Sequence, residues 1–196
     1  MTPTRLATIL ALCATCLSTT GCLGLFLGAS ATGGIAVAEE RSVGTQVDDA
    51  TIKIAVNESL FSYDQRLFQD ISTDVTEGRV LLTGKVADPQ DRIEAVRLAW
   101  QAQGVKEVIN EIQVTDKGGV GSYMTDVRIS NELRADLLFD SQIQAINFNV
   151  DTVGQIVYLT GIARNQAELD RVIDTARTIS GVKQVISHVR VQGASG

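Results

Sequence analysis

The sequence predicts an α+β protein in which one small unit of helix, strand, strand, helix and strand occurs twice. Two observations lead to this fold class. Apolar and glycine positions recur at an offset of 77 residues, as at Gly84 and Gly161, in five separate blocks. Within each copy, helical and strand periodicities follow one another in the same order. The period is too long for a common solenoid unit, so duplication of a small domain fits better.

The five blocks share one register. Residues 80–84 (VLLTG) match residues 157–161 (VYLTG), and the same three letters, GVK, occupy residues 104–106 and 181–183. The remaining blocks pair Ile52, Val56 and Leu60 with Ile129, Leu133 and Leu137, then Val108 and Ile109 with Val185 and Ile186, and Val114 with Val191.

The first helix and the hairpin of each unit follow from residue spacing. Apolar residues four apart place one stripe on one face of a helix. In the first unit, residues 70–75 and 79–86 flank a turn expected at Glu77-Gly78. In the second unit, apolar residues alternate from Ile146 to Val150, and a turn is expected at Val153-Gly154.

The second helix of each unit has start and stop signals. Asp88 is a good N-cap before Pro89 at the first helical position, and residues 165–168 (NQAE) resemble a capping box. Gly104 and Gly181 are expected to cap the C-terminal ends. Alternating apolar residues then predict a third strand. Each unit is therefore expected to form a three-stranded mixed sheet covered by two helices.

Charge argues against one class of partner. The net charge is −6, and because only Arg5 precedes Cys22, a chain starting at Cys22 carries 16 basic and 23 acidic residues, or −7. A nucleic-acid binder needs a basic face that displaces counterions from phosphate. No nucleic acid is therefore expected as a partner.

Residues that could support catalysis are sparse. His188 is the only histidine and is expected to point to solvent, so a metal site would lack further His or Cys ligands. Residues 78–85 resemble a phosphate loop, but Val86 replaces the required Ser or Thr and the segment lies across a predicted strand. We expect no enzyme activity, no catalytic residue, no metal, no cofactor and no small-molecule substrate.

The N-terminus has the layout of an export signal. Arg5 precedes an apolar run over residues 6–17, which is shorter than the roughly 20 residues of a membrane-spanning helix. A small residue directly before Cys22 fits a lipoprotein signal, although Thr19 occupies the position where leucine is usual. The alternative is ordinary secretion with cleavage after Ala36 or Ala38. Since Cys13 and Cys16 would leave with the signal, no disulfide is expected.

These features give a domain layout. We expect a signal peptide at 1–21, an acylated Cys22 with a flexible tether at 22–46, a first domain at 47–116, a Gly-rich linker at 117–124 and a second domain at 125–193.

The start of the second unit is the best candidate for a binding surface. Aromatic and apolar residues accompany arginines there, which suits a lipid headgroup interface. The candidate phospholipid-binding residues are Tyr123, Met124, Arg128, Arg134 and Phe139. In the alternative interpretation, Leu138 and Phe139 belong to the core and Arg128 pairs with Glu132 at a spacing of four.

The repeat resembles the BON domain. Residues 80–84 and 104–112 carry the resemblance in the first unit, and residues 157–161 and 181–185 carry it in the second. The second unit departs at Ser187, where the first has Asn110. With Cys22, the Gly/Ala tether and residues 41–49, the whole chain resembles the dual-BON-domain outer-membrane lipoproteins.

That resemblance implies a function without catalysis. Such proteins bind anionic phospholipid membranes mainly through the first helix of the second BON domain, here roughly residues 125–139, gather at cell-division sites and support outer-membrane integrity. They imply a lipid anchor on Cys22, with acyl chains such as palmitate, in the outer membrane facing the periplasm; Leu23 fits that sorting. The alternative is a periplasmic structural adaptor that binds an envelope protein or peptidoglycan.

Overall fold

The computed structural model describes residues 43–115 and 120–193, which fall within one compact unit, Gly34–Gly196. The predictions for the signal peptide, for Cys22 and for most of the tether lie outside the described residues. The expected fold class is confirmed: two mixed sheets are each accompanied by two long helices.

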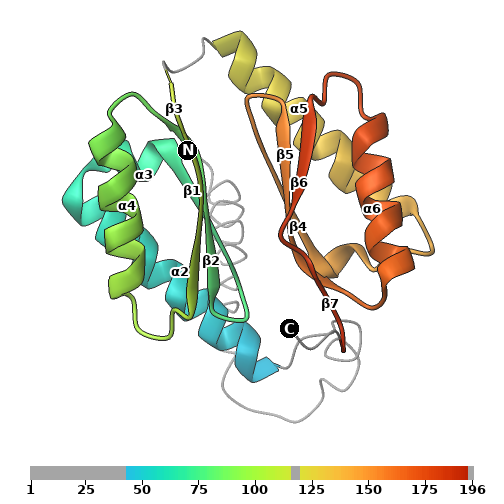
Figure 1. The fold of residues 1–196 in the computed structure, drawn as a ribbon, viewed down its shortest axis with the longest axis horizontal. Helices are drawn as coiled ribbons and strands as arrows, with labels where there is room; N and C mark the ends of the chain where they lie inside the picture. Colours follow the sequence, from blue (N-terminus) through green and yellow to red (C-terminus); the bar gives the residue numbers. More distant parts are fainter. Residues whose placement is uncertain (1–42, 116–119, 194–196) are drawn as a thin grey trace, which may run out of the picture. The chain divides into compact units, whose positions relative to one another are not determined.

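The first repeat contains three helices and one sheet. Its elements are α2 (Val43–Tyr63), α3 (Gln65–Asp70), β1 (Ile71–Thr76), β2 (Arg79–Val86), α4 (Pro89–Gln101) and β3 (Glu107–Val114). The central strand β2 pairs antiparallel with β1 and parallel with β3. Figure 1 shows α2 and α4 covering one face of this sheet.

The second repeat has the same arrangement. Its elements are α5 (Val120–Phe139), the 3₁₀ turn η1 (Ala145–Asn147), β4 (Phe148–Val153), β5 (Ile156–Ala163), α6 (Gln166–Thr178), β6 (Gln184–Ser187) and β7 (Arg190–Val191). Strand β5 pairs antiparallel with β4 and parallel with β6 and β7. Helices α5 and α6 cover one face (Figure 1).

Each repeat has its own apolar core between helices and sheet. The predicted helix stripes supply much of both cores: Ile52, Val56, Leu60, Ile129, Leu133 and Leu137 are all 4% exposed or less. They pack on the apolar side of the strands and on the second helix of the same repeat. Because each core is closed within one repeat, the opposite face of each sheet remains available for other contacts.

A buried carboxylate fixes the hairpin of each repeat. Both oxygens of Asp49 accept hydrogen bonds from the amides of Glu77 and Gly78, each at 2.8 Å. Asp126, 77 residues later, accepts from Gly154 and Gln155 at the same distances. The turn residues have positive φ, which matches the hand of a two-residue hairpin turn. The first helix therefore holds the hairpin in register.

Several boundaries differ from the predictions. The second turn is Gly154-Gln155 rather than Val153-Gly154, because β4 continues through Val153. The C-cap residues are Ala102 and Ile179, and the glycines that were expected to cap follow two residues later in the turns.

Helix α5 also begins earlier than expected. It starts at Val120, so residues 120–124 of the predicted linker are helical. The glycines near its start suggested a flexible segment, but one glycine costs a helix only about 1 kcal/mol. In this first turn, the Ser122 hydroxyl accepts a hydrogen bond from the Lys85 ammonium of the first repeat at 3.4 Å.

Candidate functional site

The helix-free faces of the two sheets contact one another. Leu81, Val153 and Tyr158 form a small apolar cluster there, with partly buried isoleucines around it. Polar contacts surround the cluster: the Thr83 hydroxyl donates to the Asp151 carboxylate, and the Gln113 amide donates to the Tyr158 hydroxyl at 3.2 Å. Burial raises the pKa of the Tyr158 phenol above its ordinary 10.0.

His188 lies at the rim of this contact and does not point freely to solvent, so that prediction is wrong. Its Nε2 is 2.9 Å from Oε1 of Glu111, and its side chain is 22% exposed. Glu111 is the position that precedes His188 by 77 residues, so equivalent residues of the two repeats meet. The contact with Glu111 of the first repeat therefore covers a side chain that an isolated second repeat would expose to water.

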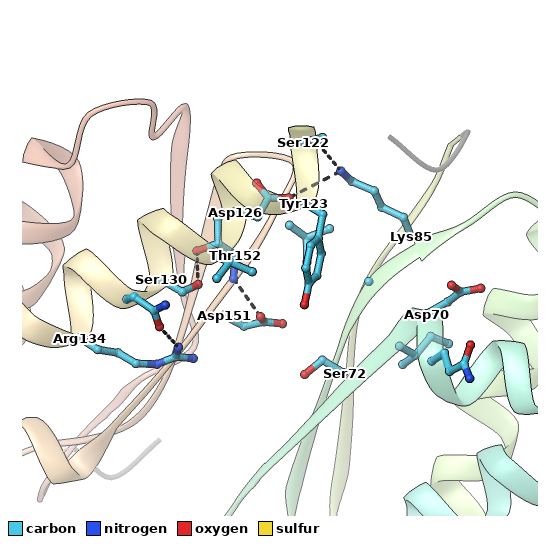
Figure 2. A pocket seen from close by; sticks show the side chains of 16 residues that line it. Asp70, Ser72, Lys85, Ser122, Tyr123, Asp126, Ser130, Arg134, Asp151 and Thr152 are labelled. Atoms are coloured by element: carbon cyan, nitrogen blue, oxygen red, sulfur yellow. Dashed lines mark hydrogen bonds and ion pairs between the residues drawn. The ribbon is translucent and has the colours of Figure 1, made fainter. Parts of the chain in front are cut away.

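A polar cleft lies beside this contact. Its volume is about 520 Å³, and β1 and β2 of the first repeat face α5 and β4 of the second across it. Polar lining residues include Ser72, Lys85, Ser122, Tyr123, Ser130, Arg134 and Asp151. Figure 2 shows the Tyr123 ring extending from α5 into this cleft.

Three carboxylates line the cleft, and two of them, those of Asp126 and Asp151, accept hydrogen bonds from the protein; the third belongs to Asp70. Asp126 accepts the two turn amides and lies 3.8 Å from the Lys85 ammonium. Asp151 accepts from the Thr83 hydroxyl and from the amide of Thr152. Their negative charge is therefore partly used within the protein.

A second cleft adjoins the first and is mainly apolar. Its volume is about 460 Å³. Its apolar lining residues are Leu137, Leu138, Ala145, Ile146, Phe148 and Val150. Arg134 lines both clefts, so its guanidinium lies where the polar and apolar regions meet.

Helix α5 exposes large apolar side chains near both of its ends, and two of them, Tyr123 and Leu138, also line the clefts. Tyr123 is 67% exposed, Met124 59%, Leu138 71% and Phe139 85%. The alternative in which Leu138 and Phe139 belong to the core is therefore wrong. Leu137, which is 1% exposed, fills the core in their place because it continues the stripe with a spacing of four.

The two predicted arginines differ in their partners. Arg128 pairs with Glu132, as the alternative interpretation expected, and also donates to the carbonyl of Ser180. Arg134 donates to the carbonyl of Val150 and, at 3.4 Å, to the Asn131 amide oxygen. Thus the charge of Arg128 is compensated on its own helix, whereas Arg134 donates to neutral oxygens.

Groups of metal ligands and membrane-spanning helices are both absent from the described part of the chain. Residues 43–115 and 120–193 contain no cluster of three or more His, Cys, Asp or Glu side chains that could hold a metal ion. Over the same ranges, no helix combines the length and apolarity that crossing a bilayer requires.

Sequence reasoning missed the members of the clefts that come from other elements. Lys85 and Ser72 belong to the first repeat, and Ile146 lies in the 3₁₀ turn. Lys85 stood out only as the end of a rejected phosphate-loop pattern. The equivalent position of the second repeat is Ile162. A charged residue in one repeat where the other has an aliphatic one could have indicated that Lys85 has a role outside the common fold.

The geometry defines a class: tandem α+β repeats that present surfaces and clefts. The family model described as the BON domain matches residues 48–116 and 125–193. The chain belongs to the BON-domain family and carries two copies of the domain.

Characterised and uncharacterised relatives share most of the chain. An uncharacterised protein of the gshII 5′ region of Anaplasma centrale is 44% identical, over 74% of this chain and 96% of that protein. Osmotically-inducible protein Y of Escherichia coli is 31% identical, over 78% and 77%. Outer membrane lipoprotein DolP of Haemophilus influenzae is 29% identical, over 85% and 86%.

Proposed function

We propose that this chain is a non-enzymatic lipoprotein of the bacterial outer membrane, anchored through Cys22 and facing the periplasm. In this proposal, its second BON domain binds anionic phospholipid and so supports outer-membrane integrity, at division sites among others. The carrying observation is that α5 exposes four large apolar side chains, which arginine accompanies. The relative from H. influenzae, an outer membrane lipoprotein by name, supports the location.

The layout of α5 suits a helix that lies in a headgroup interface. From Tyr123 to Phe139 the helix extends about 24 Å, and Tyr123 and Leu138 differ by only about 60° around its axis. Such a helix can place its apolar side chains at the acyl boundary while cations meet phosphate. Arg134 is the better cation of the predicted pair, because Glu132 compensates Arg128.

The lipid anchor and α5 have complementary roles. The acyl chains on Cys22 would hold the protein at the membrane. They would not orient the folded domains on its surface, which requires a second contact. We assign that second contact to α5. The residues around Cys22 lie outside the described part of the chain, so the anchor needs a chemical test.

Lipidation predicts a specific mature N-terminus. In the native host, mass spectrometry is expected to find the first peptide beginning at Cys22 with added acyl mass, and Cys22→Ala is expected to abolish both. The small residue before the cysteine, Gly21, supports this cleavage. A mature chain that starts after Ala36 or Ala38 would instead identify ordinary secretion.

Membrane binding by α5 predicts a large effect of two surface substitutions. In a chain carrying Cys22→Ala, which has no acyl anchor, Met124→Ser with Leu138→Ser is expected to weaken co-sedimentation with anionic vesicles about thirtyfold. Each side chain would lose about 1 kcal/mol of partial burial in lipid. Thermal unfolding is expected to stay unchanged, because both side chains are mostly exposed.

The matched control is Ile54→Ser in the same background. Ile54 is 67% exposed on α2 of the first repeat, so its loss is expected to leave vesicle binding unaltered. Trp100, the only tryptophan, is 52% exposed on α4, and its emission is expected not to shift when vesicles are added. A blue shift of the tryptophan emission would assign the membrane contact to the first repeat. Equal losses of vesicle binding in the Ile54→Ser variant and in the double variant would mean that no particular surface makes the contact.

A further inference from the structure

We propose that the two adjoining clefts bind one amphiphile, with its phosphate at Arg134 and a single acyl chain in the apolar cleft. This inference rests on the proposed function and deepens it, since it replaces adsorption on a membrane surface by capture of an individual molecule. The observation behind it is a contrast between two clefts that share Arg134: hydroxyl and charged groups are frequent in the lining of the first, and apolar side chains predominate in the second.

Arg134 is unusual among the arginines of the described residues. Eight of these ten arginines form an ion pair with a carboxylate. Within residues 43–115 and 120–193, only Arg92 and Arg134 have no carboxylate at ion-pair distance, and Arg92 lies on the exposed surface of α4. A guanidinium has five donors, and Arg134 uses two of its nitrogens on neutral oxygens. A phosphate would supply the missing counter-charge through two parallel hydrogen bonds.

The polar cleft fits a headgroup that both donates and accepts hydrogen bonds. Ser72 and Tyr123 supply hydroxyl groups from opposite walls, as Figure 2 shows. Lys85 adds an ammonium whose nearest carboxylate, Asp126, already accepts two amides. Of the three acidic residues in the lining, Asp126 and Asp151 are held by protein donors, and Asp70 lies at the end of α3 on the wall formed by the first repeat. Arg134 has no carboxylate at ion-pair distance within the described residues.

The apolar cleft fits one hydrocarbon chain. Leu138 and Ile146 are 71% and 53% exposed at its edge, although both are aliphatic. Phe148 and Val150 are buried in its floor. Asp74 also lines this cleft, but its carboxylate pairs with the Lys53 ammonium at 3.1 Å. A chain that covers the two exposed residues would remove apolar surface from water on both sides.

The test uses the full chain carrying Cys22→Ala and dodecyl phosphate below its critical micelle concentration, followed by calorimetric titration. We expect saturable binding of one molecule per chain. Each methylene buried contributes about fourfold in affinity, so decyl phosphate is expected to bind about fifteenfold more weakly. Inorganic phosphate alone and the uncharged dodecyl maltoside are both expected to bind much more weakly than dodecyl phosphate.

Variants separate the two parts of the site. Arg134→Gln and Ile146→Ser are each expected to weaken dodecyl phosphate at least tenfold, and Arg134→Lys is expected to recover part of the loss. Because Arg134 also bonds to Val150, thermal unfolding is measured for its variants; Ile146→Ser changes a half-exposed side chain and keeps the test valid if Arg134→Gln unfolds. Ile54→Ser is the control that leaves binding unchanged.

The outcomes distinguish the two proposals. Absent or non-saturating binding of dodecyl phosphate, or affinity that ignores chain length, overturns the cleft even if vesicles still bind to α5. If dodecyl phosphate binds saturably and Ile146→Ser weakens it, the cleft is supported. If vesicles fail to bind in the same protein, the membrane-surface function is overturned. Equal loss in Ile54→Ser and Ile146→Ser also overturns the cleft.

Discussion

Replacing Gly161 by alanine is expected to destabilise the second repeat severely. A β-carbon at Gly161 would lie 2.0 Å from the carbonyl oxygen of Asn147 and 3.0 Å from Cα of Phe148. Both obstacles are backbone atoms, and Phe148 is the strand partner of Gly161, so neither can move without breaking β4 from β5. The φ of +133° adds strain for any L-residue. We expect a loss of about 4 kcal/mol or more in the free energy of unfolding, measured by urea denaturation.

A second glycine separates strain from collision. Gly193 has a φ of +78°, but an added β-carbon would meet no atom within 4 Å. Gly193→Ala is therefore expected to cost only about 1 kcal/mol. Gly84→Ala in the first repeat would meet the Asp70 carbonyl at 2.1 Å and should behave like Gly161→Ala. If the free energy of unfolding fell by a similar small amount in all three variants, the neighbouring carbonyl groups would not restrict Gly84 and Gly161 to glycine.

These glycines explain why the sequence revealed the duplication so readily. The VLLTG and VYLTG blocks both end in a glycine. At that position β2 approaches the backbone just before β1, and β5 approaches the backbone just before β4, so only glycine fits in both repeats. The helix stripes and the N-caps at Asp88 and Asn165 are equally local, and the structure has them where spacing and cap chemistry predict. Such features depend on a few neighbouring residues, which a sequence displays directly.

The clefts could not be predicted in the same way. Their walls combine β1 and β2 of one repeat with α5 and β4 of the other, which no local pattern brings together. The short α3 was also missed, because six residues are too few for helical periodicity; the Asp64 cap and the edge contact of Phe61 with Phe68 accompany it. Along α5, the spacing of four placed Leu137 in the core stripe, and the exposure of the next two residues, Leu138 and Phe139, follows from that stripe.

Comparison of the repeats indicates where function diverged from fold. Positions that build the cores and the hairpin clamps are alike, for example Asp49 and Asp126. Positions that line the clefts differ: Arg134 corresponds to Asn57, and Ile146 corresponds to Gln69. The like positions account for the common fold, and the unlike positions on the surface distinguish the second copy, to which we assign the proposed ligand.

The second large effect is expected for Glu168→Gln, which should destabilise the second repeat by about 3 kcal/mol at neutral pH. The Glu168 side chain is 2% exposed and accepts from the backbone amides of Gln144 and Arg164, each at 2.7 Å, and from the Arg164 guanidinium at 2.8 Å. A glutamine would present an NH₂ group to donors and leave the Arg164 charge without its partner. Glu132→Gln, which breaks an exposed helix pair, is expected to cost less than about 1 kcal/mol.

The effect of Glu168→Gln is also expected to depend on pH. Burial raises the pKa of Glu168, but hydrogen bonds from Arg164 and from the amides of Gln144 and Arg164 outweigh it, so the folded pKa lies below the ordinary 4.5. A lowered folded pKa contributes stability that is complete above about pH 4.5 and is lost as the pH falls through the folded value. The difference in unfolding free energy between wild type and Glu168→Gln should therefore be largest near neutrality and shrink in acid. A difference that stays constant down to about pH 3 would mean that the carboxylate charge of Glu168 does not stabilise this fold.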